Sequence, residues 1–235
     1  DVQTLDDTTA DGITLSVNHS DAAGNAATAA TRTFNKDVIV PTVAVSAPSA
    51  SIVNGSGSIT YTVTYTGGNT FNLTAGEITL NTTGGASCSK AVTNGTTSTP
   101  TVTLSSCTGN GTVGITVGAN TATDTAGNPN GASSASATFD VDTTVPTVAI
   151  SSPAASSYIN NSTQAAFTVS GSCSENGRVV SLSMTDGTHT AVTATPTCNT
   201  SATPNWSASL DVQTLDDTTA DGITLSVNHS DAAGN

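Results

Sequence analysis

Short stretches in which apolar and polar residues alternate make up much of the chain. Between Ser58 and Tyr65, for example, Ile, Tyr, Val and Tyr occupy every second position (SITYTVTY). Gly, Asn, Asp and Pro residues separate these stretches. Alternation with a period of two is typical of strands that bury one face, and the separating residues are those that form turns. The pattern therefore predicts an all-β fold of many short strands.

Two internal repeats divide the chain. Residues 1–25 recur without a change as residues 211–235, which lie 210 positions later. A weaker match sets residues 37–50 against residues 142–155, which lie 105 positions later. Repeats at a fixed spacing indicate an array of similar units. We therefore expect two related modules, type A and type B, to alternate along a longer array that arose by tandem duplication.

The repeats also predict where the modules begin and end. Residues 1–40 would be the last strands of a type B module, residues 41–144 a complete type A module, and residues 145–235 a type B module that lacks its last strand. Their size, and turn signals roughly every 8 to 12 residues, match a seven-stranded sandwich.

The alternating stretches give the expected strands. Those of type A are residues 42–46, 58–65, 77–81, 90–93, 101–105, 112–117 and 133–141. Those of type B are residues 147–151, 165–170, 179–184, 191–195, 206–212 and 223–228, with residues 26–34 as the last strand of the other type B copy.

Aromatic residues make up only 3% of the chain, so each module must fill its core mainly with Val, Ile, Leu and Ala. The few large side chains expected in the cores are Phe71, Phe139, Tyr158, Phe167 and Trp206. A domain of about 100 residues with so thin a core is marginally stable.

Each module contains one pair of cysteines, which we expect to form stabilising disulfides. The pairs are Cys88 with Cys107 in type A and Cys173 with Cys198 in type B. Each bond would contribute about 3 kcal/mol in the chain-entropy model and implies an oxidising compartment. Metal–thiolate ligation is the alternative, but no Cys-x-x-Cys spacing supports it.

The charge balance excludes several function classes. The chain has 17 acidic residues against four Lys and Arg, a net charge of −13, so we expect no binding to nucleic acid. No apolar stretch approaches the roughly 18 residues of a membrane helix, so we expect no membrane insertion by this segment and an export signal outside it. The three histidines, His19, His189 and His229, have no local nucleophile and acid, so we expect no enzyme.

Acidic residues gather where the ends of modules should meet. At the junction that enters type A, Asp37 would face Asp124 and Asn128, and the preceding module would offer further acids from its loop. Those acids are Asp6, Asp7 and Asp11. The residues expected at the junction that enters type B are Asp140, Asp142, Asp231, Asn235 and Glu175. Neighbouring carboxylates repel one another, and a calcium ion with six to eight oxygen ligands would relieve that repulsion.

Two interpretations of these loops stay open. The Asp-x-Ala-Gly-Asn loops would either supply calcium ligands or form tight turns in which Asp and Asn bond their own backbone. The complete calcium loops D-x-D-x-D-G and G-G-x-G-x-D are both absent. The linkers Asp37-VIVPT and Asp142-TTVPT contain Pro and β-branched residues but no Gly, so they should be extended and stiff.

The sequence resembles the tandem bacterial immunoglobulin-like domains of large surface adhesins and other giant secreted repeat proteins. For type B, the resemblance lies in Trp206-SASLDVQTLDDTTADGITLSVNHSDAAGN and in Phe34-NKD followed by VPTVAVSAP. The type A motifs that carry it are Ile59-TYTVTY, Leu73-TAGEITL, Val102-TLSSCTGNGTVGITV and Asp124-TAGNPN. The resemblance implies immunoglobulin-like Greek-key β-sandwiches arranged end to end. It also implies calcium at some junctions, with Asp140, Asp142 and Asp231 as the clearest ligands, although the Ser105-SCTGNG loop departs from the pattern because it has no acid.

Two functions follow as expectations. The resemblance implies an extracellular or cell-surface spacer that supports adhesion through a ligand-binding part elsewhere, with neighbouring repeats of the same chain as partners. The alternative is a subunit of an extracellular filament, in which residues 26–34 of one chain complete the type B module of an identical chain.

Overall fold

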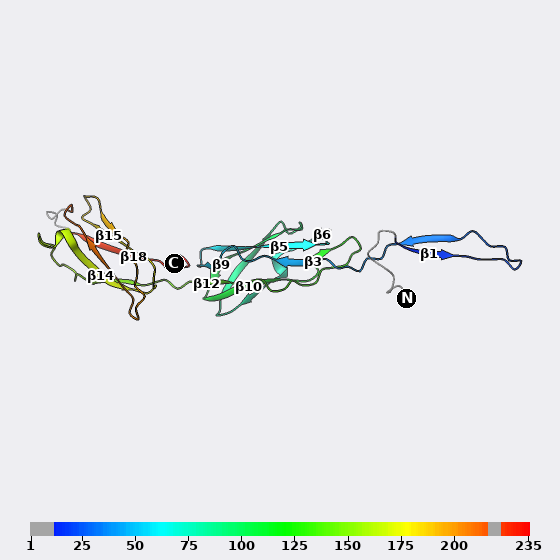
Figure 1. The fold of residues 1–235 in the computed structure, drawn as a ribbon, viewed down its shortest axis with the longest axis horizontal. Helices are drawn as coiled ribbons and strands as arrows, with labels where there is room; N and C mark the ends of the chain where they lie inside the picture. Colours follow the sequence, from blue (N-terminus) through cyan, green and yellow to red (C-terminus); the bar gives the residue numbers. More distant parts are fainter. Residues whose placement is uncertain (1–11, 216–221) are drawn as a thin grey trace.

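The computed structural model describes residues 12–215 and 222–235 of the chain. Their regular elements are β-strands and two short 3₁₀ turns, Ala75–Glu77 (η1) and Gln164–Ala166 (η2). Figure 1 shows three parts that follow one another along the long axis. We name them the leading hairpin (β1 and β2), the first body (residues 42–141) and the second body (residues 148–229). The predicted all-β fold is confirmed.

The leading hairpin consists of β1 (Ile13–Val17) and β2 (Ala30–Phe34), which pair antiparallel with Ile13 opposite Phe34. Its apolar side chains are largely exposed: Leu15 is 55% exposed and Val17 58%. Among the described residues, no other strand pairs with this hairpin. It therefore has no hydrophobic core of its own.

The first body contains two four-stranded sheets. The strands of one, in spatial order, are β3 (Thr42–Val45), β5 (Ser58–Thr66), β9 (Thr101–Thr108) and β8 (Ser87–Thr93). Those of the other are β4 (Ile52–Val53), β12 (Phe139–Val141), β10 (Gly111–Val117) and β7 (Ile78–Thr82). Neighbours are antiparallel except β4 and β12, which are parallel. A short pair, β6 (Thr70–Phe71) with β11 (Ala122–Thr123), lies at the side.

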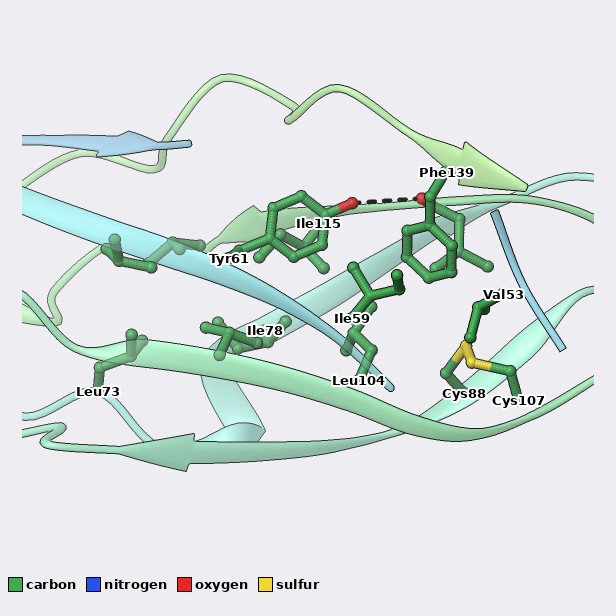
Figure 2. Packing of buried hydrophobic residues seen from close by; sticks show 14 of the residues in the cluster. Val53, Ile59, Tyr61, Leu73, Ile78, Cys88, Leu104, Cys107, Ile115 and Phe139 are labelled. Atoms are coloured by element: carbon green, nitrogen blue, oxygen red, sulfur yellow. Dashed lines mark hydrogen bonds between the residues drawn. A yellow bond between two sulfur atoms is a disulfide. The ribbon is translucent and has the colours of Figure 1, made fainter. Parts of the chain in front are cut away.

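The alternation along β5 determines how the first body packs. Ile59, Tyr61, Val63 and Tyr65 are buried, whereas the residues between them are more exposed. Figure 2 shows Tyr61 and Ile59 among the buried residues of the core. The Tyr61 hydroxyl donates to the carbonyl oxygen of Ala137 at 3.0 Å. The buried phenol is therefore accommodated without an unpaired polar group.

The second body contains two three-stranded sheets. One has β13 (Val148–Ser152), β14 (Phe167–Cys173) and β17 (Asn205–Leu210) in spatial order. The other has β16 (Val192–Ala194), β15 (Val180–Thr185) and β18 (Thr224–His229). Trp206, which is 1% exposed, is the largest fully buried side chain, and its indole N–H donates to the Ser172 carbonyl at 3.2 Å.

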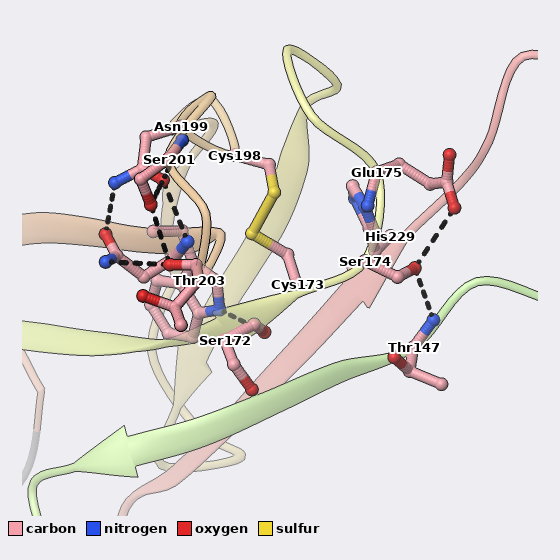
Figure 3. The surroundings of a disulfide bond; sticks show 12 residues. Thr147, Ser172, Cys173, Ser174, Glu175, Cys198, Asn199, Ser201, Thr203 and His229 are labelled. Carbon is pink, nitrogen blue, oxygen red and sulfur yellow. Dashed lines mark hydrogen bonds between the residues drawn. A yellow bond between two sulfur atoms is a disulfide. The ribbon is translucent and has the colours of Figure 1, made fainter.

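Both predicted cysteine pairs are disulfide-bonded. Cys88 on β8 bonds to Cys107 on the neighbouring β9, and the bond lies near Val53 at one end of the first core (Figure 2). Cys173 at the end of β14 bonds to Cys198 in the second body (Figure 3). Two disulfides and no free cysteine suit an oxidising, extracellular or periplasmic compartment. Neither described part of the chain contains a helix with the length and apolar character required to cross a membrane.

Two sequence expectations need correction. Tyr158 is not a core residue: it is 94% exposed, because it lies in the irregular segment between β13 and η2. The strand expected over residues 133–141 is regular only from Phe139. Before that point the hydroxyls of Ser133 and Ser136 accept the N–H groups of Val117 and Ile115, so side-chain oxygens replace the carbonyls of a regular ladder.

Candidate functional site at the junctions

Three loops of the sequence Asp-x-Ala-Gly-Asn have the same internal geometry. In each, one carboxylate oxygen of the Asp accepts the backbone N–H of the Asn four residues later, and the other accepts the Asn side-chain amide. In residues 21–25 these distances are both 2.8 Å. They are 2.8 and 2.9 Å in residues 124–128 and 2.9 and 2.8 Å in residues 231–235. We refer to the three as the first, second and third loop.

The sequence of each loop explains its shape. The Asp side chain takes the place of a backbone acceptor and closes the turn. The Gly has φ of +87° in the first loop, +91° in the second and +89° in the third. Residues with a side chain rarely adopt this conformation, so the turn requires glycine at that position. The motif is therefore a structural unit that folds the same way in three contexts.

The second and third loops also hold the linkers that enter the two bodies. The side-chain amide of Asn128 donates to the backbone carbonyl of Asp37 at 3.0 Å. The side-chain amide of Asn235 makes the same bond to the carbonyl of Asp142 at 2.8 Å. The two junctions thus use one device, in which the Asn binds its own Asp and the backbone of the linker Asp.

The first body holds the start of the second linker. Asp142 donates its backbone N–H to the Val53 carbonyl at 3.0 Å. The Asn110 side chain accepts the N–H of Thr143 at 2.8 Å and donates to the Thr144 hydroxyl at 2.6 Å. The linker therefore leaves the first body with its backbone already ordered.

The second body holds the other end of this linker, and the two bodies also touch directly. The Thr147 N–H donates to the Ser174 hydroxyl oxygen at 2.9 Å (Figure 3). The Asn54 side chain of the first body donates to the Gly234 carbonyl of the third loop at 3.2 Å. Hydrogen bonds from both sides thus restrict the orientation of one body relative to the other.

Hydrogen bonding keeps the loop carboxylates ionised. The side-chain amide of Asn128 is the main cause that lowers the pKa of Asp124 below its ordinary value, and Asn25 lowers the pKa of Asp21 in the same way. For Asp231, burial raises the pKa, but the bonds from Asn235 and from the loop backbone outweigh it and the net pKa is lowered. N–H donors therefore stabilise the charge of each carboxylate.

The other predicted metal ligands are bonded within their own segments. The Asp37 carboxylate accepts the Ile39 N–H at 3.0 Å, and the Asp142 carboxylate accepts the Thr144 N–H at 2.9 Å. Glu175 accepts the Ser174 hydroxyl at 3.2 Å (Figure 3). Asp140 is exposed on β12. The remaining predicted ligands, Asp6, Asp7 and Asp11, lie outside the described residues.

The arrangement is the one expected from turn chemistry. Within residues 12–215 and 222–235, no three acidic, His or Cys side chains converge as a metal site. The Asn side chains present N–H groups, not oxygens, to the linker carbonyls. The geometry does not gather the six to eight oxygens that calcium takes, so calcium stays a prediction and no step below depends on it.

Several residues of the second junction were missed by the sequence analysis. Asn54, Asn110 and Ser174 supply side-chain hydrogen bonds to the linker or the third loop. Arg178 donates to the Asp231 carbonyl oxygen. The signal available in the sequence was the Gly-Asn-Gly turn around Asn110, which has no acid and therefore did not suggest a junction contact.

No model of a known protein family matches the chain, and a search of curated proteins finds no match either. The function is therefore argued from the geometry of the junctions and from the sequence motifs.

Proposed function

We propose that this chain is a stiff spacer segment of an extracellular or cell-surface repeat protein, built from immunoglobulin-like sandwiches joined end to end. The observation that carries the proposal is the second junction, where hydrogen bonds from both bodies hold the linker that connects them. A spacer must transmit orientation from one unit to the next, and a linker ordered from both sides does so.

The strand order supports an immunoglobulin-like fold for the first body. Taking β3, β5, β7, β8, β9, β10 and β12 as the seven strands A to G, one sheet has the order A-B-E-D and the other contains C-F-G. These are the two sheets of the constant-type immunoglobulin fold. The short β4, which is parallel to β12, extends the second sheet.

The second body supports the same assignment. Strands β13, β14 and β17 correspond to A, B and E, and strands β15 and β18 correspond to C and F. One disulfide in each body stabilises a small core, and both bonds favour an oxidising compartment. The net charge of −13 disfavours a nucleic-acid partner.

The stiffness of the second junction can be tested by residual dipolar couplings of the full chain. If the junction is stiff, the amides of the two bodies share one alignment tensor. Replacing the two Asn side chains that grip the linker, Asn110→Ala with Asn235→Ala, should give the bodies different tensors.

Asn25→Ala is the matched control, because Asn25 has the same place in the first loop as Asn235 in the third but bonds no described linker residue. It should leave the shared tensor unchanged. Two unequal tensors in the unmodified chain would contradict the spacer proposal.

A further inference from the structure

One edge of β18 has no hydrogen-bonded strand among the described residues. β18 pairs with β15 on one side only. In the first body the corresponding strand, β10, lies between β7 and β12 and pairs with both. An open strand edge presents unpaired N–H and C=O groups and is a template for another strand.

The leading hairpin contains a strand that fits this edge. Residues 13–17 of β1 have the same sequence as residues 223–227, which include most of β18, because the flanking 25-residue segments are identical. β1 pairs antiparallel with β2 over five residue pairs, from Ile13 opposite Phe34 to Val17 opposite Ala30. The same register on the second body would set Ile223 opposite Phe34 and Val227 opposite Ala30.

The side chain that β2 would bring has a buried counterpart in the first body. Phe34 lies 105 positions before Phe139, in the weaker repeat. Phe139 is opposite Val113, as Phe34 is opposite Ile13. Phe139 is 1% exposed and its ring centroid lies 6.4 Å from that of Tyr61, whereas Phe34 is 51% exposed. Phe34 thus has the sequence position of a core residue without a core around it.

We propose that β2 of a second copy of this chain docks on the open edge of β18. The exchange would break the β1–β2 ladder of one hairpin and form an equivalent ladder on the second body. An isolated two-stranded hairpin is marginally stable in water, so leaving it costs little. The exchange also removes Phe34 from water and covers Leu225 and Val227, which are only partly buried.

The geometry of this contact determines the form of the assembly. The donor strand and the acceptor edge lie at opposite ends of the molecule in Figure 1, so the contact is heterologous and does not close on itself. Head-to-tail chains of increasing length follow. Because each copy carries a charge of −13, mutual repulsion opposes assembly at low salt, and added salt should strengthen it. This inference does not depend on the spacer function.

The first test is size-exclusion chromatography with light scattering at increasing protein concentration, at low and at high salt. The proposal expects a ladder of oligomers that grows with concentration and with salt. A strict monomer at every concentration and salt level would overturn it.

Two matched variants separate strand docking from other association. Phe34→Ser should weaken association at least about tenfold, because it removes the side chain that enters the core. Leu15→Ser changes the same hairpin but not the docked strand, so it should leave association unchanged or strengthen it. Oligomers that respond equally to both variants would contradict the proposal.

The register gives a second readout. Ser226→Cys with Thr31→Cys should form a disulfide between chains, seen as a ladder on a non-reducing denaturing gel. Ser16→Cys with Thr31→Cys places the pair opposite each other within one hairpin, so it should lock the hairpin and suppress the oligomers. Absence of the intermolecular bond in the first variant would refute the register, and with it the proposed docking.

Discussion

The two bodies differ most at one corresponding strand. In the first body β10 lies between two neighbours, and its Val113, Ile115 and Val117 are fully buried. In the second body β18 has one described neighbour, and Leu225 and Val227 are only partly buried. The apolar pattern is the same in both strands, so the difference arises from the strand that is present on one side and not on the other.

The leading hairpin extends this comparison to identical sequences. Leu15 and Val17 are more than half exposed, although the same residues as Leu225 and Val227 of β18 pack against a core. Asp21 of the first loop is exposed, whereas its copy Asp231 is 2% exposed. The sequence of a strand decides which face is apolar, but its neighbours decide whether that face is buried.

The largest expected effect separates the two cores. Trp206→Ala removes the largest buried side chain of the second body and should destabilise that body by about 3–5 kcal/mol. The first body has a separate hydrophobic cluster, so its unfolding should not change. Differential scanning calorimetry of the full chain should show one transition that moves to lower temperature and one that stays.

Tyr158→Ala is the control for that experiment. Its side chain is 94% exposed, so the substitution should change stability by less than about 0.5 kcal/mol. A single transition that shifts as a whole after Trp206→Ala would show that the two bodies unfold together, contrary to the comparison.

A smaller effect should rank the three corresponding positions of the comparison. Ile115→Ala, in a fully buried position, should cost about 3 kcal/mol. Leu225→Ala should cost about 1 kcal/mol because that side chain is partly buried, and Leu15→Ala should cost less than about 0.5 kcal/mol. Chemical denaturation measures the three values, and equal costs for Leu225 and Leu15 would remove the distinction between their environments.

Much of the strand pattern could be predicted from the sequence because each strand buries one face. Every expected strand overlaps an observed one, and the cysteine pairs were found from their distribution between the modules. The two-residue strands β4, β6 and β11 were missed, since two residues cannot display an alternation. Burial was harder to predict: Tyr158 is an aromatic residue in an irregular segment, and nothing local indicates that it stays in water.

The junctions could be predicted only in part. The Asp and Asn residues of the loops were recognised because turn chemistry and metal ligation use the same residue types. Which atoms meet was not predictable, because the linker contributes backbone carbonyls, and these carry no sequence signal. Asn54 and Asn110 come from loops of the first body that approach the second only in the folded chain.

Acid should loosen the second and third loops selectively. The folded pKa values of Asp124 and Asp231 lie below their ordinary values, so these groups stabilise the fold above the unfolded pKa of about 3.9. That stability is lost as the pH falls through the lower, folded pKa. Hydrogen exchange of the Asn128 and Asn235 amides should therefore speed up below about pH 4, beyond the intrinsic effect of pH.

Asp124→Asn is the control for the acid experiment. It keeps the shape of the side chain but does not titrate, so the extra acid dependence at Asn128 should disappear. If that dependence persists in the variant, the carboxylate of Asp124 is not its cause.

Calcium should have the smallest effect, and it tests whether hydrogen bonding alone is sufficient at the junctions. To bind an ion, the carboxylates of Asp37 and Asp142 would have to leave the N–H groups of Ile39 and Thr144. With the affinity usual for extracellular modules, about 0.1 to 1 mM, a tenfold excess of calcium would stabilise the chain by about 1.4 kcal/mol. Titration calorimetry that shows no heat, with the same melting curve in calcium and in chelator, would leave the junctions to their hydrogen bonds. Heat that is lost in Asp142→Asn would instead show that a cation reorganises the linker, because Asp142 would then act through its carboxylate as well as through the carbonyl that Asn235 already holds.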